Sequence, residues 1–413
     1  MDFIRLHTNL AYYLFDRPDD DDAASDFFDV ARLKEAMAKA LVAFYPLAGH
    51  LSVDGSGRVQ IDCNGEGALF VVARSGNTLD EIKELKPSLE LRRLLVPRID
   101  EPPSVILAVT FFVCGGVALG TALHHVSIDA RSALHFFQTW SALCRDGDRA
   151  TVELPCHDRT LLRARSPPAI QPDALLTFYP KVALSDPSGP TANEVFTISR
   201  DQAAALRRLC GGASTFCAVS ALLWQCTCVA RRLPLDSKAL LAFPANVRRR
   251  VKPPLPDRYF GNALLRVGVA AAARDIASEP LGSVAGRIRA AIGRMDDDEM
   301  VRSAIDYHHE TAEMDRQPGK GILPETELHV ISWLGMPLSD ADFGWGKPRV
   351  VSRAESNRGG FLHLMSNGAA DGGVRVLMQA RPSNLPVRPW LMCMEAANIK
   401  ELERLLHEAL ARC

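Results

Sequence analysis

The stretch 105–144 constrains the fold of this chain more than any other part of its sequence. Two β-rich runs, 105–113 and 117–123, are separated by Cys-Gly-Gly, a pattern typical of a hairpin. The second run continues into HHVSIDA (124–130), after which apolar residues recur at helical spacing. His125 is then expected on the turn between strand and helix, where a side chain is held firmly and can face a cleft.

The amino-acid composition limits the classes of protein to which this chain can belong. With 413 residues the chain can form two domains, and 47% hydrophobic and 23% charged residues are ordinary for a globular protein. A formal net charge of -1 provides no overall field for nucleic acid or an anionic membrane. No apolar run reaches the length of a membrane span, and no leader segment is visible. The ten cysteines form no CxxC pair and are expected to be reduced and buried. A cytoplasmic, monomeric protein is predicted.

Periodicity and turn residues predict the organisation of the chain. A Pro- and Gly-rich stretch at 165–193 indicates an extended crossover, which gives an N-terminal half at 1–170, a linker at 171–190 and a C-terminal half at 191–413. Helices are expected at 30–45, 199–209, 214–232 and 276–294, and in a last segment capped by Asn398. Strands are expected at 240–243, 264–269, 327–333 and 373–379.

The HHVSIDA motif has three interpretations. His124 and His125 can be a packed pair at a strand end. They can also bind a metal with Asp129, although adjacent strand residues point to opposite faces and do not easily reach one ion. In the third interpretation one histidine is a general base, because a side chain with an unperturbed pKa of about 6.5 can accept a proton near neutrality. HxxxD alone is a weak pattern, so the third interpretation draws on its position and on a second motif.

The second motif is DFGWGKP at 342–348. In combination with HHVSIDA it resembles the signature pair of the plant BAHD acyltransferases, which transfer an acyl group from a coenzyme A thioester to an alcohol or amine. Further stretches resemble the hydroxycinnamoyltransferase branch of that family: FYPLAGHL, IDCNGEGALFV, LELRRL, PPLPDRYFGN and ISW. The resemblance implies a two-domain α/β fold like that of chloramphenicol acetyltransferase, with a channel between the halves.

The resemblance also implies residue roles. His125 would be the base, and Asp129 would brace the turn through an ion pair, with Arg248 as the candidate partner. Transfer would be direct within a ternary complex, with acyl-CoA as co-substrate and with no permanent cofactor or metal. The glycine-rich loop would be structural, through Asp342, Gly344, Trp345 and Gly346. Arg248, Arg249 and Lys252 form a basic cluster that could hold coenzyme A, although a solvated charge run is the more common explanation.

The chain departs from its relatives where the acceptor would bind. Gly335 occupies the position of an arginine that grips acidic acceptors, and Leu10 replaces a serine. The predicted acceptor-site residues are Thr8, Leu10, Tyr12, Trp333 and Gly335. These changes favour an arylalkylamine such as tryptamine or tyramine, or agmatine or a polyamine, over a hydroxy acid.

Alternatives remain open at this point. The same machinery could acylate an alcohol, and a non-catalytic binding protein, a condensation domain or a zinc hydrolase are weaker possibilities. By the resemblance, relatives carry a further strand ahead of this start. Either Met1 is internal to a longer frame or the protein tolerates the loss.

Overall fold

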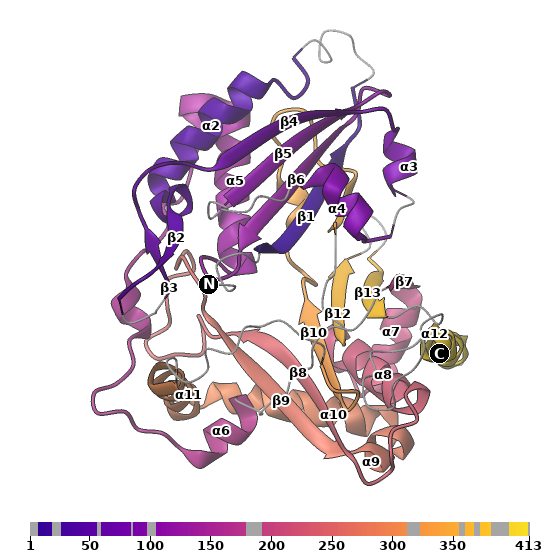
Figure 1. The fold of residues 1–413 in the computed structure, drawn as a ribbon. Helices are drawn as coiled ribbons and strands as arrows, with labels where there is room; N and C mark the ends of the chain where they lie inside the picture. The colour runs from indigo at the N-terminus through magenta and orange to yellow at the C-terminus, as the bar shows by residue number, and fades with distance from the viewer. Residues whose placement is uncertain are drawn as a thin grey trace. The chain divides into compact units, whose positions relative to one another are not determined.

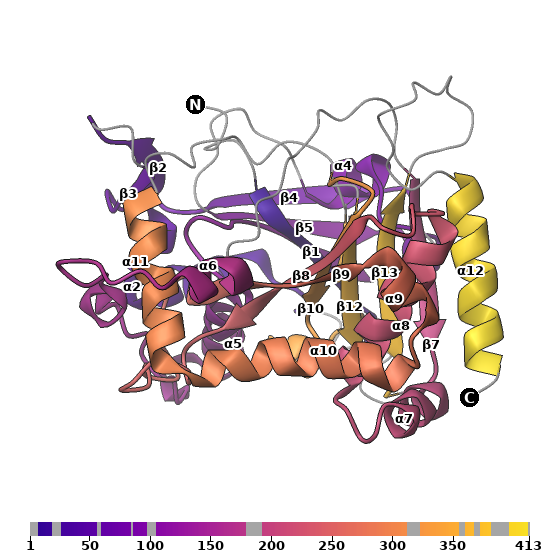
Figure 2. The same cartoon turned by 90° about the horizontal axis from the view of Figure 1, so that it is seen from below.

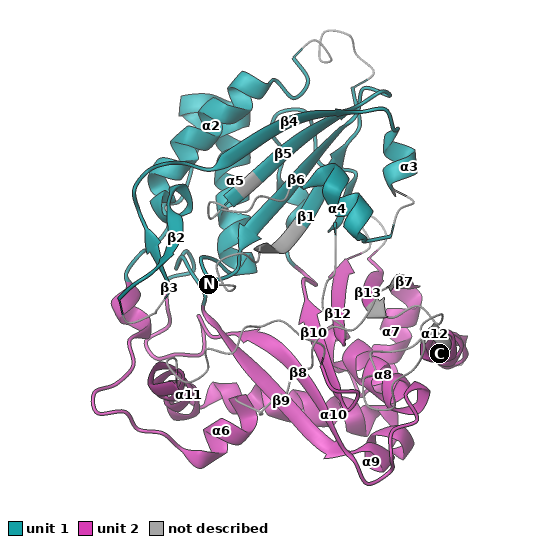
Figure 3. Ribbon diagram, viewed as in Figure 1, with its two compact units in different colours: residues 1–158, 256–262, 336–356 teal, residues 159–255, 263–335, 357–413 magenta. Residues whose placement is uncertain are grey.

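The computed structural model describes residues 7–18, 26–55, 59–83, 86–96, 105–178, 192–311, 323–354, 360–366, 372–380 and 396–411. Two compact units are present (Figure 3): unit 1 comprises residues 1–158, 256–262 and 336–356, and unit 2 comprises residues 159–255, 263–335 and 357–413. Segments 256–262 and 336–356 therefore belong to unit 1. The predicted division into 1–170, 171–190 and 191–413 follows sequence position alone and leaves both segments with the C-terminal half.

Unit 1 is built on a mixed sheet. In chain order its elements are β1 (His7–Phe15), α2 (Val30–Ala43), η2 (Tyr45–Ala48), β2 (His50–Val53), β3 (Val59–Asp62), β4 (Leu69–Ser75), α3 (Leu79–Lys83), α4 (Leu89–Leu95), β5 (Val105–Phe112), β6 (Val117–His124), α5 (Ala130–Asp146), η3 (Gly147–Arg149), η6 (Leu338–Asp340) and β11 (Val350–Arg353). Within the described residues the main sheet has the order β11-β1-β6-β5-β4, of which Figure 1 labels β1, β6, β5 and β4, while β2 and β3 form a separate pair.

The predicted hairpin ahead of the HHVSIDA motif is confirmed. Strands β5 and β6 pair antiparallel, with Ala108 opposite Gly120, and Gly115 in the connecting turn has φ +83°. Positive φ values strain residues with a side chain, so glycine suits this turn. Strand β6 lies in the interior of the sheet, between β1 and β5, and every one of its residues is buried. His124 therefore lies at the end of an interior strand of the sheet in unit 1.

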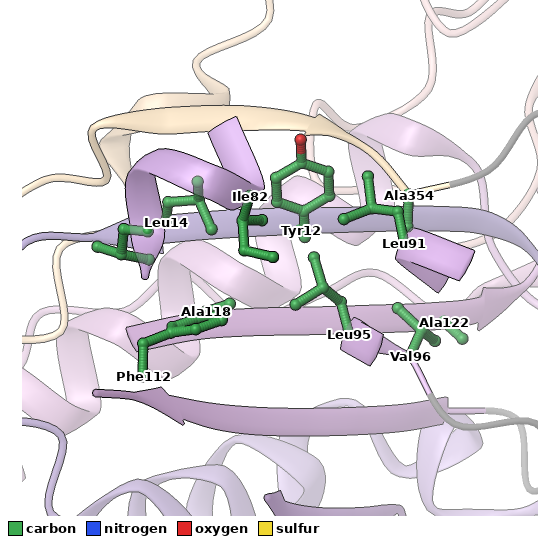
Figure 4. Close-up of a cluster of buried hydrophobic side chains, with 11 residues drawn as sticks. Tyr12, Leu14, Ile82, Leu91, Leu95, Val96, Phe112, Ala118, Ala122 and Ala354 are labelled. Carbon is green, nitrogen blue, oxygen red and sulfur yellow. The ribbon is translucent and has the colours of Figure 1, made fainter. Parts of the chain in front are cut away.

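Helices cover both faces of this sheet. Tyr12 and Leu14 of β1 pack with Leu91 and Leu95 of α4 in a buried apolar cluster (Figure 4). Tyr13, which alternates with them, lies 5.7 Å from Phe137 of α5, measured between ring centroids. Burial raises the pKa of the Tyr13 hydroxyl above its usual range. The alternation of β1 therefore buries side chains on both faces.

Gly120 shows how closely α4 approaches the sheet. A Cβ atom at position 120 would lie 1.8 Å from the carbonyl oxygen of Leu95. The backbone at the end of α4 therefore rests directly on β6, and only glycine leaves room for it.

Unit 2 is built on a second mixed sheet. Its elements are η4 (Arg159–Leu162), α6 (Pro172–Phe178), β7 (Ala192–Ile198), α7 (Arg200–Leu209), α8 (Thr215–Ala230), β8 (Lys238–Asn246), β9 (Leu264–Ala272), α9 (Ala273–Ser278), α10 (Leu281–Gly293), η5 (Arg294–Asp296), α11 (Asp298–Thr311), β10 (Glu327–Ser332), β12 (Phe361–Ser366), β13 (Val374–Ala380) and α12 (Ala396–Ala411). In the described part of the chain the strand order is β7-β13-β12-β10-β8-β9. Helices α8 and α10 pack against this sheet, and α12 packs on α8 (Figure 2).

Three predicted elements differ from the structure. The helix expected at 276–294 is interrupted at Pro280, which cannot donate a backbone hydrogen bond, so α9 ends at Ser278 and α10 begins at Leu281. Asn398 is not the N-cap of the last helix, because α12 begins at Ala396. The crossover expected to be extended contains α6, and its residues 179–191 lie outside the described part of the chain.

The described cysteines are free thiols, and most are buried. Burial raises the pKa of Cys144 to about 11 and that of Cys228 to about 12, which keeps both thiols protonated and unreactive. Cys63 and Cys114 are exposed, contrary to the expectation of burial. Among the described residues, no helix is both long and apolar enough to span a membrane.

Candidate active site

The two histidines of the HHVSIDA turn differ in their exposure to solvent. His124 ends β6 and is 2% exposed, whereas His125 is exposed at the first position of the turn. Nδ1 of His124 accepts a hydrogen bond from the backbone N–H of Val126 at 3.3 Å, and its carbonyl accepts one from Ser127 at 3.0 Å. His124 is therefore part of the packed turn, and His125 is the histidine that a substrate could reach.

Asn262 holds this turn from a distant part of the sequence. The two hydrogens of its side-chain amide are donated to the carbonyl of His125 at 2.7 Å and to that of Val126 at 3.1 Å. The first carbonyl belongs to the exposed histidine and the second to the residue that follows it. Asn262 therefore fixes the backbone from which the His125 imidazole projects.

The segment carrying Asn262 is itself tied into unit 1. The Ser132 hydroxyl accepts a hydrogen bond from the N–H of Gly261 and can donate one to its carbonyl, each at 3.1 Å. The backbone of Cys156 exchanges hydrogen bonds with Arg258 and Phe260. In the sequence, Asn262 ends PPLPDRYFGN, a stretch that resembles the hydroxycinnamoyltransferases, but no local pattern gives it a role. That resemblance is the signal that could have drawn attention to it.

Asp129 caps the helix that follows the turn. It is 1% exposed, and its Oδ1 accepts a hydrogen bond from the backbone N–H of Ser132 at 3.0 Å. Its own carbonyl accepts from the N–H of Ala133 at 2.9 Å. This is the geometry of an N-cap, which fixes where α5 begins. The predicted ion pair with Arg248 joins residues of different units and stays a prediction.

The DFGWG loop is closed by Asp342. The carboxylate oxygen Oδ1 of this residue accepts hydrogen bonds from the N–H groups of Gly344 at 2.9 Å and Gly346 at 3.0 Å. The two glycines have φ values of +103° and +94°. A Cβ atom at Gly344 would also lie 2.7 Å from the guanidinium of Arg32. Glycine is thus favoured at both positions by the backbone conformation, whereas the contact with the flexible Arg32 side chain could be relieved by its movement.

Aromatic packing anchors the same loop. Phe343 is 1% exposed and meets Trp140 of α5 edge to face, with ring centroids 4.7 Å apart. Trp345 stacks on Phe28 at 5.0 Å, and the Arg32 guanidinium lies 4.8 Å from the indole centroid. These contacts hold the loop against α2, α5 and the segment before α2.

The predicted acceptor residues lie in both units. Thr8 and Leu10 are on β1, where the backbone of Leu10 is opposite Ala122. Tyr12 is 2% exposed within the α4 cluster. In unit 2, Trp333 is 7% exposed and packs edge to face on His363. Gly335 is exposed with φ +70°. Their assignment to one acceptor site stays a prediction.

The three residues of the basic cluster differ in their exposure to solvent. Arg248 is 2% exposed, and its Nη1 is hydrogen-bonded to the side-chain oxygen of Asn246 at 3.3 Å. Arg249 and Lys252 are exposed. Two of the three predicted coenzyme A contacts are thus exposed and the third is buried, and their role in binding coenzyme A stays a prediction.

The arrangement suits general-base chemistry. An exposed imidazole stands on a turn fixed by a strand end, a helix cap and an amide clamp, which is the rigidity that proton transfer requires. Within the described residues, no three His, Cys, Asp or Glu side chains gather into a group that could bind a metal. The absence of a metal from the reaction stays a prediction.

Sequence comparisons place the chain among plant transferases. A family model described as "Transferase family" matches residues 1–386. Putrescine hydroxycinnamoyltransferase 1 of Oryza sativa subsp. japonica is 43% identical over 405 residues, covering 92% of this chain and 90% of that protein. Shikimate O-hydroxycinnamoyltransferase of Nicotiana tabacum is 34% identical over 430 residues, covering 98% and 92% respectively.

Structural comparison identifies the fold. The crystal structure of F. graminearum TRI101 complexed with coenzyme A and deoxynivalenol matches with a TM-score of 0.78, covering 98% of this chain and 94% of that one at 18% identity. The expected two-domain fold like that of chloramphenicol acetyltransferase is confirmed.

Proposed function

We propose that this chain, which belongs to the BAHD family of acyltransferases, is an N-acyltransferase that transfers a hydroxycinnamoyl or benzoyl group to an amine. It is an enzyme that uses acyl-CoA as its co-substrate. The observation that carries the choice of an amine is the 43% identity, over 92% of the chain, to a relative named for putrescine. A cytoplasmic, monomeric enzyme remains our expectation.

The proposed reaction uses His125 as general base. The imidazole accepts a proton from the acceptor nitrogen while that nitrogen attacks the carbonyl carbon of the thioester. A C–N bond forms, the tetrahedral intermediate collapses, and the C–S bond breaks. The coenzyme A thiolate leaves and takes the proton from the imidazolium. The products are an amide and free coenzyme A, and no covalent acyl-enzyme is formed.

The glycine at position 335 supports the proposal that the acceptor carries no carboxylate. By the family resemblance, an arginine at this position binds acidic acceptors, and glycine offers no cation for such a group. Its φ of +70° also means that Gly335→Arg would strain the backbone in addition to adding a charge. That variant is therefore a poor test, and the acceptor is better identified with the parent enzyme.

The identifying experiment is a matrix of acyl-CoA donors against acceptors, read by mass spectrometry. Donors are p-coumaroyl-, feruloyl- and benzoyl-CoA; acceptors are putrescine, agmatine, tyramine, tryptamine, shikimate and quinate. Amide products with at least one amine, and little ester, are expected. Efficient shikimate or quinate esters without any amide would refute the proposal.

The pH dependence of the rate gives a second test. An alkylamine has a pKa near that of lysine, about 10.4, so at pH 7 only roughly one molecule in 10³ is the neutral nucleophile. The rate with an amine should therefore continue to rise above the titration range of histidine. A plateau near pH 8 would contradict reaction through the free amine.

The second candidate is acylation of an alcohol by the same residues. It is favoured by the 34% identity to a shikimate O-hydroxycinnamoyltransferase. An alcohol does not ionise in this range, so its rate should reach a plateau once His125 is neutral. The two candidates thus differ in product and in pH profile.

A further inference from the structure

Unit 2 contains a pocket that has no part in the site described above. Its volume is about 430 Å³, and its lining residues come from segment 159–164 and from the C-terminal half of α11. Pockets that hold small molecules typically measure roughly 300–1,000 Å³. This pocket is therefore large enough for an organic ligand and larger than a bare ion needs.

The charge of this pocket is positive. Its basic lining residues are Arg159, Arg163, His308 and His309, all exposed at the surface. None of the described lining residues is acidic. Within the described part of the chain, the side chains of Arg163 and His309 make no hydrogen bond or ion pair. The two guanidinium groups keep their charge at any physiological pH.

Apolar side chains complete the lining. Leu162 and Ile305 contribute hydrocarbon surface beside the cations. An inorganic anion would leave this surface in contact with water, whereas a ligand with an apolar body would cover it. The pocket thus combines an anion-binding rim with an apolar wall.

The two walls of the pocket are fixed to each other. Asp306, which follows Ile305 on α11, is 1% exposed. Its carboxylate accepts hydrogen bonds from the backbone N–H of Arg165 at 2.8 Å, from Nε of the same residue at 2.8 Å, and from the N–H of Ala169 at 2.9 Å. The segment that continues from the pocket is thereby clamped to α11, so a ligand would find the site already formed.

We propose that this pocket is a second ligand site that binds a phosphate monoester with a small apolar body. A phosphate monoester carries about -1.5 to -2 charges at pH 7 and offers three acceptor oxygens, enough to accept hydrogen bonds from both the Arg163 guanidinium and the His309 imidazole. A carboxylate offers one charge and two oxygens. The site is independent of the proposed acyl transfer, since none of its residues belongs to the catalytic turn.

Isothermal titration of the whole protein with phenyl phosphate tests the proposal. Phenyl phosphate should bind more tightly than inorganic phosphate, which lacks the apolar body, and than benzoate, which lacks the second charge. The double variant Arg163→Gln, His309→Gln should weaken binding at least about tenfold, since charge-assisted hydrogen bonds are lost. Arg208→Gln, an exposed arginine of α7, is the matched control and should leave binding unchanged.

Three results would overturn the proposal. Equal affinity for phenyl phosphate, inorganic phosphate and sulfate would mean an adventitious ion only. Unchanged binding in the double variant would place the ligand elsewhere. Displacement of phenyl phosphate by coenzyme A, with a raised KM for acyl-CoA in the double variant, would make the pocket part of the donor site. Retained acyl transfer in the double variant distinguishes failure of this proposal from failure of the proposed function.

Discussion

At the scale of single residues, exposure distinguishes two adjacent histidines. His125 is accessible, and His124 is buried with its Nδ1 engaged by the turn. His125→Ala should therefore lower kcat/KM by about 10²- to 10⁴-fold, the usual effect of losing a general base, with little change in melting temperature. His124→Asn, which can keep an acceptor near the position of Nδ1, should retain more activity. A folded His124 variant that is less active than the His125 variant would reverse the assignment.

Asn262 offers a second prediction at this scale, because among the described residues its side chain contacts the HHVSIDA turn through backbone carbonyls. Asn262→Ala removes both donors, and Asn262→Asp additionally places a carboxylate against two carbonyl oxygens. Misplacement of His125 should lower kcat by about 10- to 100-fold, with the KM for acyl-CoA nearly unchanged. We expect kcat to be highest in the parent, lower in the Ala variant and lowest in the Asp variant. Steady-state kinetics separate the two constants. Parental kcat in the Asp variant would show that the clamp does not position the base.

At the scale of elements, Asp129 determines where α5 begins. Asp129→Ala loses the cap, whereas Asp129→Asn retains it, because asparagine caps about as well as aspartate. The Asn variant should therefore be about 1 kcal/mol more stable than the Ala variant in chemical unfolding. Equal stability of the two variants would argue against the capping role.

The charge of Asp129 is tested by the same pair of variants. If Asp129 pairs with Arg248 as predicted, both variants leave a buried arginine without its counter-ion, at a cost of about 3–5 kcal/mol. The Asn variant should then still be well below the parent in stability. An Asn variant as stable as the parent would leave the cap as the role of this side chain and refute the ion pair.

At the scale of the whole molecule, Glu327 couples folding to pH. It lies on β10, is 7% exposed, and has a carboxylate oxygen 3.9 Å from the Arg266 guanidinium. Burial raises the pKa of this carboxyl to about 7 despite the nearby positive charge. The folded protein therefore holds a proton that the unfolded chain releases. Its stability should fall as pH rises from about 4.5 to about 7.

Glu327→Gln removes this titration. The variant should match the parent near pH 4 and exceed it above pH 7 by up to roughly 3 kcal/mol, since one pKa unit corresponds to about 1.36 kcal/mol. Chemical unfolding across pH measures the difference. Glu403→Gln, an exposed residue of α12, is the control and should show no such slope. A constant difference between Glu327→Gln and the parent at every pH would contradict the raised pKa.

Local patterns in the sequence were sufficient for much of the secondary structure. The hairpin before His124, the helix from Ala130 and the helix capped by Ser199 were predictable, because each depends on periodicity and capping within a few residues. The interruption at Pro280 was also predictable from local sequence, because proline donates no backbone hydrogen bond and breaks a helix. The start of α12 at Ala396, ahead of the predicted cap at Asn398, shows that a capping pattern alone does not fix a helix boundary.

The sequence by itself determined the family, because its motifs extend over nearly the whole chain, and through that resemblance it named His125 as the candidate base. Only the tertiary structure decided which histidine is exposed, that Asn262 holds the turn of His125, and that Glu327 is buried enough to shift its pKa. Each of these depends on hydrogen bonds and packing between segments far apart in the chain. Spacing along a sequence does not encode such contacts, because they form only when the chain folds.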